Sequence, residues 1–209
     1  MEVMRRKTNK QKVAEGALEK QIQENMTLSH QLQQLERTLS DIEKCMHFIN
    51  ERVQKGWQLY GLEKFEDEKY LIYFLECQFE EDPQYAYNYN LYAYVSSNLS
   101  TPVYKALLEW KFDSRFDVKR RLYIESQYIN DKNMQGHGIG TASIEMIKKI
   151  AKQLQCDSID GLRRPLNPIM SDEEKEKESE KLYKFYEKNG FVQSPNTDRI
   201  SIPLKRDIE

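Results

Sequence analysis

The chain has 209 residues, of which 39% are hydrophobic and 32% are charged, and its formal net charge at pH 7 is −2. This length suits one domain with an appendage and excludes two ordinary enzyme domains. A nearly neutral surface makes nucleic acid a poor candidate partner. No apolar run approaches the roughly 18 residues of a membrane span, and no apolar stretch follows the basic N-terminus as it does in a signal peptide. We therefore expect a cytoplasmic protein with no membrane partner.

The cysteines and histidines predict neither a metal site nor a disulfide. The three cysteines and three histidines share no metal-ligand or redox spacing: Cys45, Cys77, Cys156, His30, His47 and His137. The three cysteines are therefore expected to be reduced thiols. The sequence therefore shows no pattern that supports a zinc site or a Ser-His-Asp triad.

Residues 1–55 predict a basic arm followed by a long helix with a heptad seam. The apolar residues of the seam alternate at intervals of four and three, at Leu28, Leu32, Leu35, Leu39, Ile42, Met46, Ile49 and Val53. Asn25 occupies position a of a heptad. A buried asparagine at this position fixes the register of a coiled coil and favours two helices, because the asparagine of the partner helix can satisfy its amide. The pattern predicts a homodimer through a coiled coil of residues 18–53.

The alternative is that this helix folds back on its own domain, which needs the same seam. At 1.5 Å per residue the helix is about 55 Å long, more than one small domain can cover. Its length therefore favours the dimer.

After Gly56 the sequence changes to segments typical of antiparallel strands. Residues 69–79, 87–97, 103–112 and 120–129 are rich in tyrosine, isoleucine, valine and phenylalanine, and turn or breaker residues separate them. The third segment suits a helix as well. Residues 56–209 are expected to form one domain.

The second half of that domain alternates helices and strands. A helix is expected from Thr141 to Leu154, and a short strand near residues 156–164. Ser171 and Glu174 form a capping box that opens a charged helix reaching Asn189. Two short strands follow, and the whole order predicts an α+β domain.

Three glycines stand within five residues where the first of these helices begins: Gly136, Gly138 and Gly140. Consecutive backbone N–H groups at the positive end of a helix dipole suit a phosphate. The GxGxG spacing lacks the last interval of the dinucleotide fingerprint, and no Lys-Ser or Lys-Thr pair follows, as a P-loop requires.

A different family fits this loop. The sequence QGHGIG at residues 135–140 resembles the Q/R-x-x-G-x-G/A signature of the GCN5-related N-acetyltransferases (GNAT family). The sequence LYKFYEKNGF at residues 182–191 resembles the second signature of the family, an aromatic-rich helix ending in Y-x-x-x-G-F. The resemblance covers residues 57–206 and is specific in 120–204. It implies a mixed, mostly antiparallel sheet flanked by helices, here preceded by the long helix.

The resemblance also implies a function. GNAT enzymes transfer the acetyl group of acetyl-CoA, without a metal, to a primary amine of a small molecule, peptide or protein. The alternative is a catalytically silent acyl-CoA-binding or scaffold protein that recruits a partner through its coiled coil. The presence of both the glycine loop and Tyr186 favours the enzyme.

Two segments are implied to bind acetyl-CoA. The pyrophosphate would be held by the main chain of Gln135, Gly136, His137, Gly138, Ile139, Gly140 and Thr141. The end of the preceding strand, Tyr128, Ile129 and Asn130, would splay from its neighbour and pair with the pantetheine arm. One of its amides would polarise the thioester carbonyl.

Two residues are implied to act in catalysis. Tyr186 matches the tyrosine that donates a proton to the departing thiolate, and a phenol with a pKa of about 10 is protonated at neutral pH. Glu125 is the candidate general base, on a strand face that it shares with Tyr123 and Gln127 by alternation. The alternatives are a core aromatic and a surface glutamate.

The sequence departs from the family where the acceptor would bind. The usual pair of helices after the first strand has no counterpart between residues 57 and 97, so the long helix replaces part of that wall or the site is open. Ser179 stands where an asparagine is common. The acidic residues of the segment 172–178 suit a cationic substrate, or else form a solvated helix face.

Overall fold

The computed structural model describes residues 9–66, 69–78, 86–113, 119–163, 170–195 and 197–204. The chain divides into two compact units, Met1–His47 and Phe48–Glu209. The predicted boundary between residues 55 and 56 lies further along the chain than this division.

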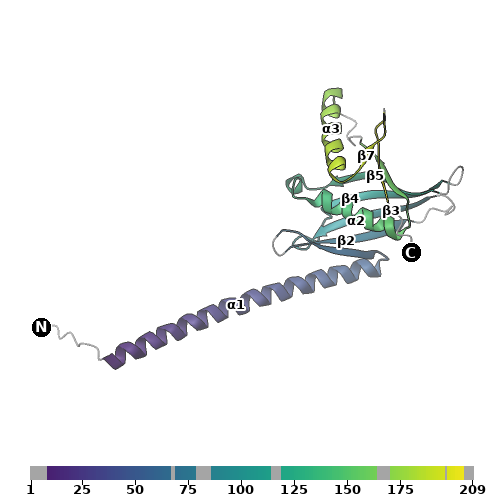
Figure 1. The fold of residues 1–209 in the computed structure, drawn as a ribbon. Helices are drawn as coiled ribbons and strands as arrows, with labels where there is room; N and C mark the ends of the chain where they lie inside the picture. The colour runs from purple at the N-terminus through teal and green to yellow at the C-terminus, as the bar shows by residue number, and fades with distance from the viewer. Residues whose placement is uncertain are drawn as a thin grey trace. The chain divides into compact units, whose positions relative to one another are not determined.

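The first unit is built on the helix α1, which spans Asn9–Gln54 and continues into the second unit (Figure 1). The predicted long N-terminal helix is confirmed. Its seam is half exposed, with exposed fractions of 51% to 61% at Leu18, Leu28, Leu32, Leu35, Leu39, Ile42 and Met46. None of the helices in the described ranges is both long and apolar enough to cross a membrane.

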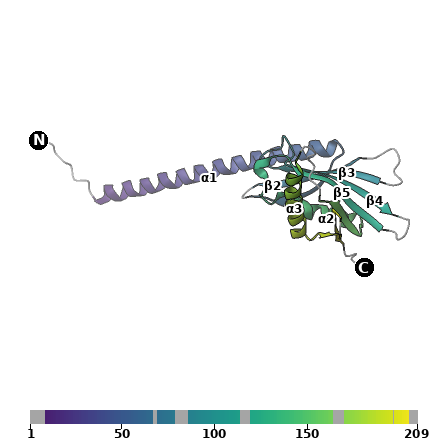
Figure 2. The ribbon, with the colours of Figure 1, turned by 90° about the horizontal axis from the view of Figure 1, so that it is seen from above.

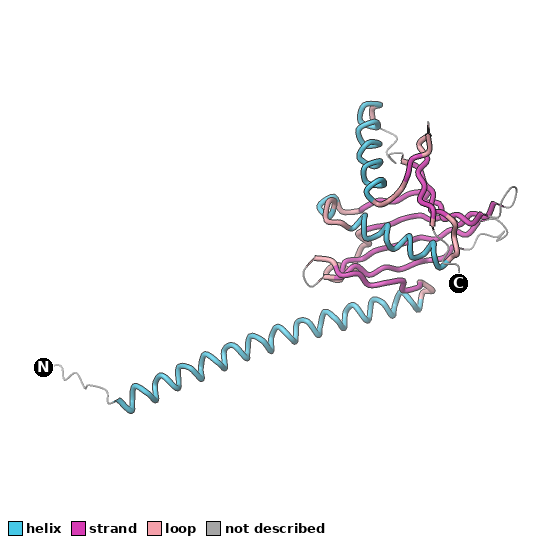
Figure 3. Tube along the Cα trace, viewed as in Figure 1, coloured by secondary structure: helices cyan, strands magenta, loops and turns pink. Residues whose placement is uncertain are grey.

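The second unit contains an eight-stranded sheet (Figure 1, Figure 3). Its strands are β1 (Gln58–Lys64), β2 (Tyr70–Gln78), β3 (Ala86–Val95), β4 (Tyr104–Asp113), β5 (Lys119–Ile129), β6 (Ser158–Leu162), β7 (Val192–Gln193) and β8 (Arg199–Pro203). The order is β1-β2-β3-β4-β5-β6-β8-β7, and only the β5–β6 pair is parallel. Residues 103–112 therefore contribute a strand and not a helix. The predicted α+β class, with a mixed and mostly antiparallel sheet, is confirmed.

Two helices lie on one face of this sheet (Figure 2). Helix α2 (Ile139–Gln153) directs Ile144, Ile147 and Ile150 onto the strands, where they join a core cluster with Leu108 and Leu122. Helix α3 (Asp172–Lys188) begins at the predicted capping box and adds its buried Tyr186 to the same cluster. We call this side of the sheet the core face.

A smaller apolar cluster covers part of the opposite face. Phe74 of β2 and Tyr94 of β3 alternate with core-face residues, and the ring of Phe48 meets both, at centroid distances of 5.7 and 4.9 Å. Ile49 is also buried, and Arg52 stacks over the Trp57 ring. The last turns of α1 therefore belong to the core of the second unit, which is why that unit begins at Phe48.

Candidate active site

The parallel pair of β5 and β6 opens halfway along β5. The two strands are in register from Arg121, opposite Ser158, to Ile124, opposite Gly161. Strand β5 continues to Ile129 and remains paired with β4 on its other side. Within the described residues, one edge of β5 from Glu125 to Ile129 thus has no neighbouring strand. We call this segment the open edge.

A β-bulge lies where the open edge begins. Leu107 of β4 faces Ser126, but the next residue, Leu108, faces Ile124, so Glu125 is an extra residue in β5. The bulge puts Gln127 on the core face with Ile124. The predicted alternation of Glu125 with Tyr123 and Gln127 on one face is therefore wrong, because one added residue inverts the pattern that follows it.

The hydrogen bonds at the end of β5 fix the direction of its backbone groups. The Asn130 N–H donates to the Val103 carbonyl over 2.9 Å, and its side-chain amide donates to the Pro102 carbonyl. Because backbone groups alternate between the two edges of a strand, the N–H groups of Ile129 and Gln127 point to the open edge. Tyr128 and Asn130, in contrast, direct their backbone groups toward β4.

The glycine loop lies between β5 and α2, after the short 3-10 helix η1 (Lys132–Met134). Gly136 and Gly138 have φ values of +86° and +84°, and a Cβ built on either would meet nothing within 4 Å. Glycine is thus required by the left-handed backbone and not by crowding from the protein. The space next to both residues is open.

Backbone donors are available where α2 begins. The helix starts at Ile139, and its N-cap Gly138 has no side chain to satisfy the first turn. The N–H groups of Ile139, Gly140 and Thr141 meet no acceptor in the described ranges. Gln135 differs from them, because its N–H already donates to the Lys132 carbonyl. An anion is the ligand that such a helix end attracts.

Other contacts hold this loop to its surroundings. A Cβ on Gly140 would lie 3.1 Å from the Phe185 ring, so this glycine lets α2 approach α3 closely. His137 Nδ1 contacts the Glu66 carboxylate, which follows β1. The loop is thus fixed on two sides while its glycines stay open to solvent.

Tyr186 reaches β5 from α3. Its hydroxyl accepts a hydrogen bond from Gln127 Nε2 over 2.7 Å, and Gln127 Oε1 accepts one from the Tyr104 hydroxyl over 2.6 Å. Burial raises the pKa of Tyr186 to about 12, although the Gln127 hydrogen bond acts in the opposite direction. The phenol is therefore protonated at neutral pH, and it lies beside the open edge.

Glu125 is exposed at the bulge, where β5 and β6 separate. Tyr186 contacts β5 at Gln127, and Glu125 lies two residues before Gln127 on the same strand. The structure adds Gln127 and Tyr104, which sequence reasoning missed. Their connection depends on the bulge, for which the sequence carries no signal.

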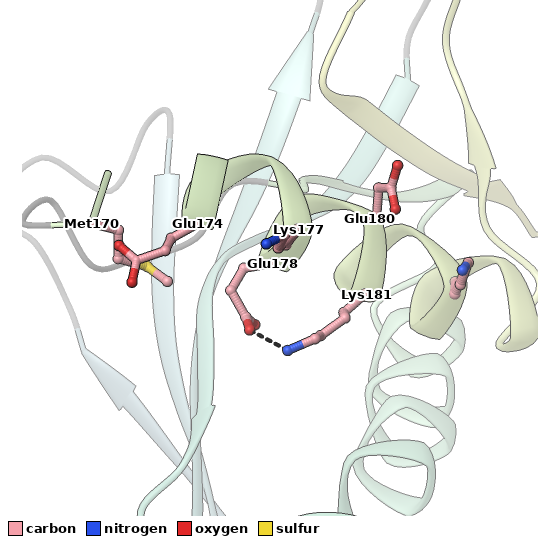
Figure 4. Close-up of a pocket in the computed structure, with 7 residues that line it drawn as sticks. Met170, Glu174, Lys177, Glu178, Glu180 and Lys181 are labelled. Atoms are coloured by element: carbon pink, nitrogen blue, oxygen red, sulfur yellow. Dashed lines mark hydrogen bonds and ion pairs between the residues drawn. The ribbon is translucent and has the colours of Figure 1, made fainter. Parts of the chain in front are cut away.

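A charged pocket lies along α3, and its lining includes none of these residues (Figure 4). Its lining is Met170, Glu174, Lys177, Glu178, Glu180, Lys181 and Lys184. Glu178 pairs with Lys181 over 2.5 Å, and Asp172 pairs with Lys175 over 3.5 Å. These intrahelical pairs favour a solvated helix face for the acidic segment over a site for a cationic substrate. Ser179 lies elsewhere on the helix, and its hydroxyl donates to the Arg163 carbonyl, just after β6.

Comparisons with known proteins give structural neighbours only. No family model matches the sequence, and no curated protein matches it. A chain of the NatC complex bound to Gag peptide and CoA is similar, with 20% identity and a TM-score of 0.39 over 56% of this chain and 71% of that one.

Two further structures are similar at lower identity. For a GNAT-family acetyltransferase from Listeria monocytogenes 4b F2365 the identity is 12% and the TM-score 0.38, over 55% of this chain and 64% of that one. This chain thus spans slightly less than two thirds of the Listeria protein. For AtaTR bound with AcCoA the identity is 15% and the TM-score 0.35, over 57% and 68% of the two chains.

The order of the elements, and not these scores, identifies the fold. An antiparallel meander leads into β5, and a crossover through the glycine loop and α2 leads to the parallel β6. Helix α3, which carries Tyr186, and the two last strands follow. This is the arrangement that the motifs at residues 135–140 and 182–191 imply, and the chain has a GNAT-like fold.

Proposed function

We propose that the protein is an N-acetyltransferase that transfers an acetyl group from acetyl-CoA to a primary amine. The observation that carries this proposal is the convergence of three features in the second unit. These are the open edge of β5, the unsatisfied N–H groups at the start of α2, and the buried phenol of Tyr186. Each suits one part of the reaction.

The binding of acetyl-CoA is supported by backbone groups. The N–H groups of Ile139, Gly140 and Thr141, with the dipole of α2, suit the pyrophosphate. The left-handed Gly136 and Gly138 leave open space on the same loop. The pantetheine arm carries amides, which can pair with the open edge of β5 as an added strand does.

The chemistry requires two proton movements. A neutral amine attacks the thioester carbonyl, a C–N bond forms, and the C–S bond breaks. The nitrogen loses one proton to a base, and the departing thiolate takes the proton of Tyr186, which water then restores. A backbone N–H of the open edge, of Gln127 or Ile129, would stabilise the oxygen that becomes negative during the attack.

Glu125 is proposed as the base. An amine with a pKa near 10 is mostly protonated at pH 7 and must lose a proton before it can attack. A carboxylate that reaches the amine directly or through a water can accept this proton. Its exposure at the bulge supports this role, because the amine has to arrive from solvent.

Release of thiol from acetyl-CoA tests the function. With a panel of small amines and amine-bearing peptides, we expect release that depends on the amine and yields one N-acetylated product per thiol. Glu125→Gln should change the pH dependence of kcat/KM. Tight binding of CoA without release by any amine would instead favour the silent binding protein.

We propose in addition that α1 pairs with α1 of a second copy. The half-exposed seam from Leu18 to Met46 supports this, because isolated helices rarely expose so regular an apolar face. Asn25 is exposed on the same helix and could be satisfied by its mate. Ile49 is buried in the second unit, so the uninterrupted exposed seam ends at Met46, and Val53 beyond it is 49% exposed.

Light scattering tests this assembly. We expect a mass near twice the 25.0 kDa of one chain at micromolar concentration. The double substitution Leu32→Glu and Leu35→Glu should give a monomer, because it puts charges into the seam. Gln33→Glu and Gln34→Glu, which add the same charges outside the seam, should leave the dimer intact. A wild-type mass near that of one chain would refute the pairing.

Truncation separates the dimer from fold-back. The cut belongs after Met46, because Phe48 and Ile49 are part of the core of the second unit. Under pairing, residues 47–209 give a soluble monomer that binds CoA. Under fold-back, the same fragment exposes an apolar surface and aggregates.

A further inference from the structure

The side-chain amide of Gln127 lies between two phenols on the core face. The Tyr104 hydroxyl donates to Gln127 Oε1, and Gln127 Nε2 donates to the Tyr186 hydroxyl. Tyr104 is 1% exposed and Tyr186 is 4% exposed. The two hydroxyls are thus buried, whereas Gln127 is half-buried, and a buried hydroxyl left without a partner is costly.

The bulge is the reason that this amide faces α3. Gln127 is opposite Ala106, and Ile124 is opposite Leu108, two residues that share the core face. Without the extra Glu125, alternation would turn Gln127 to the face of Tyr123, away from Tyr186. The bulge thus brings a polar amide into the core beside the open edge.

The direction of the two hydrogen bonds is set by the chemistry of the amide. Oε1 can only accept and Nε2 can only donate. Since Tyr104 donates to Oε1, the Nε2 group faces Tyr186. The Tyr186 oxygen accepts the hydrogen bond from Nε2, so the Tyr186 hydroxyl can donate its own proton to another partner. In a reversed amide, Oε1 would accept a hydrogen bond from the Tyr186 hydroxyl, and the hydroxyl of the more deeply buried Tyr104 would have no acceptor for its proton.

Resting on the acetyltransferase function proposed above, we propose that Gln127 is a positioning residue for Tyr186. It holds the phenol so that its proton faces the open edge of β5, and Tyr104 locks the amide in that orientation. When the C–S bond breaks, the thiolate takes this proton, and the phenolate keeps the hydrogen bond from Nε2 until water returns a proton. Gln127 itself gains and loses no proton.

A double-mutant cycle tests this role. Gln127→Leu removes both hydrogen bonds of the amide, and loss of the one to Tyr186 should lower kcat about tenfold and leave the KM for acetyl-CoA unchanged. In the Tyr186→Phe background it should cause no further loss, because the group on which it acts is gone. An equal loss in both backgrounds would overturn the proposal. Tyr73→Phe is the matched control, since this buried hydroxyl bonds Ser143 and not Tyr186, and it should keep the wild-type kcat.

A pH profile gives a second readout that a packing role would not change. In Gln127→Glu the ionised carboxylate can only accept, so the Tyr186 hydroxyl donates its hydrogen bond to this carboxylate and not toward the open edge, and activity falls. When protonated, the same group can accept from Tyr104 and donate to Tyr186, as the amide does. The ratio of mutant to wild-type kcat should therefore rise as pH falls through the pKa of the introduced carboxyl, which burial raises above its ordinary value of about 4.3.

The outcomes separate this proposal from the function on which it rests. If the wild type releases no thiol with any amine, the acetyltransferase function fails and the role of Gln127 fails with it. If the wild type turns over but the cycle is additive and the Gln127→Glu ratio is flat with pH, the function stands and the positioning role is wrong.

Discussion

Gly138→Asp is expected to abolish CoA binding. The residue is the N-cap of α2 with a φ of +84°, and a Cβ there meets no protein atom within 4 Å, so the new carboxylate would enter the open space next to the loop. If CoA binds as proposed, a negative charge there would face its pyrophosphate, and like charges in contact cost several kcal/mol. Calorimetry with CoA should show an affinity at least ~10²-fold weaker than that of the wild type.

Gly56→Asp is the matched control for backbone strain. Gly56 has a φ of +86° with nothing within 4 Å, so the same substitution imposes the same left-handed conformation at the end of α1. This variant should bind CoA like the wild type. Gly138→Asn, which tolerates that conformation and adds no charge, should lie between the two. Equal CoA affinity of Gly138→Asp and the wild type would remove the loop from the binding site.

Some features could be predicted from the sequence because they depend on residue types that are specific to one local structure. Ser171 and Glu174 form the expected capping box, and both of its hydrogen bonds are present. The spacing of Gly136 and Gly138 predicted a special loop, and both have the left-handed backbone that glycine permits. The four predicted strand segments also became strands, since tyrosine, isoleucine, valine and phenylalanine are enriched in strands.

The bulge at Glu125 could not be predicted in this way. Its position depends on which residues of β4 face β5, and Leu107 and Leu108 lie in a different segment of the chain. Local alternation therefore gave the wrong face for Gln127. The missed link from Tyr104 through Gln127 to Tyr186 is a direct consequence, because it exists only when the extra residue turns the amide to the core face.

Two other features show the same limit. Ile49 fits the heptad seam and is also buried in the second unit, so periodicity identifies an apolar face but not the surface that covers it. Strand β1 was missed because it is an edge strand whose residues are exposed or half-buried. Such a strand needs no apolar alternation to pair with β2.

Tyr186→Phe is expected to lower kcat by ~10²-fold or more and to leave the fold and CoA affinity intact. The ring packs edge-on against Phe185 and Phe191, and phenylalanine keeps those contacts while it removes the proton. A loss of this size is typical of a missing general acid. Thiol release at saturating acetyl-CoA and amine, with calorimetry on CoA and thermal unfolding alongside, separates catalysis from binding and stability.

The pH dependence makes the same prediction sharper. Burial raises the pKa of Tyr186 to about 12, so the acid form is fully present from pH 7 to 10 and is lost only as pH rises through about 12. Wild-type kcat should show no fall due to Tyr186 below pH ~10, and the mutant deficit should be constant over that range. Tyr183→Phe is the matched control, since its hydroxyl bonds Glu187 on the same helix, and it should retain the wild-type rate. A Tyr186→Phe enzyme as fast as Tyr183→Phe would reduce Tyr186 to a core aromatic and leave the thiolate to be protonated by water.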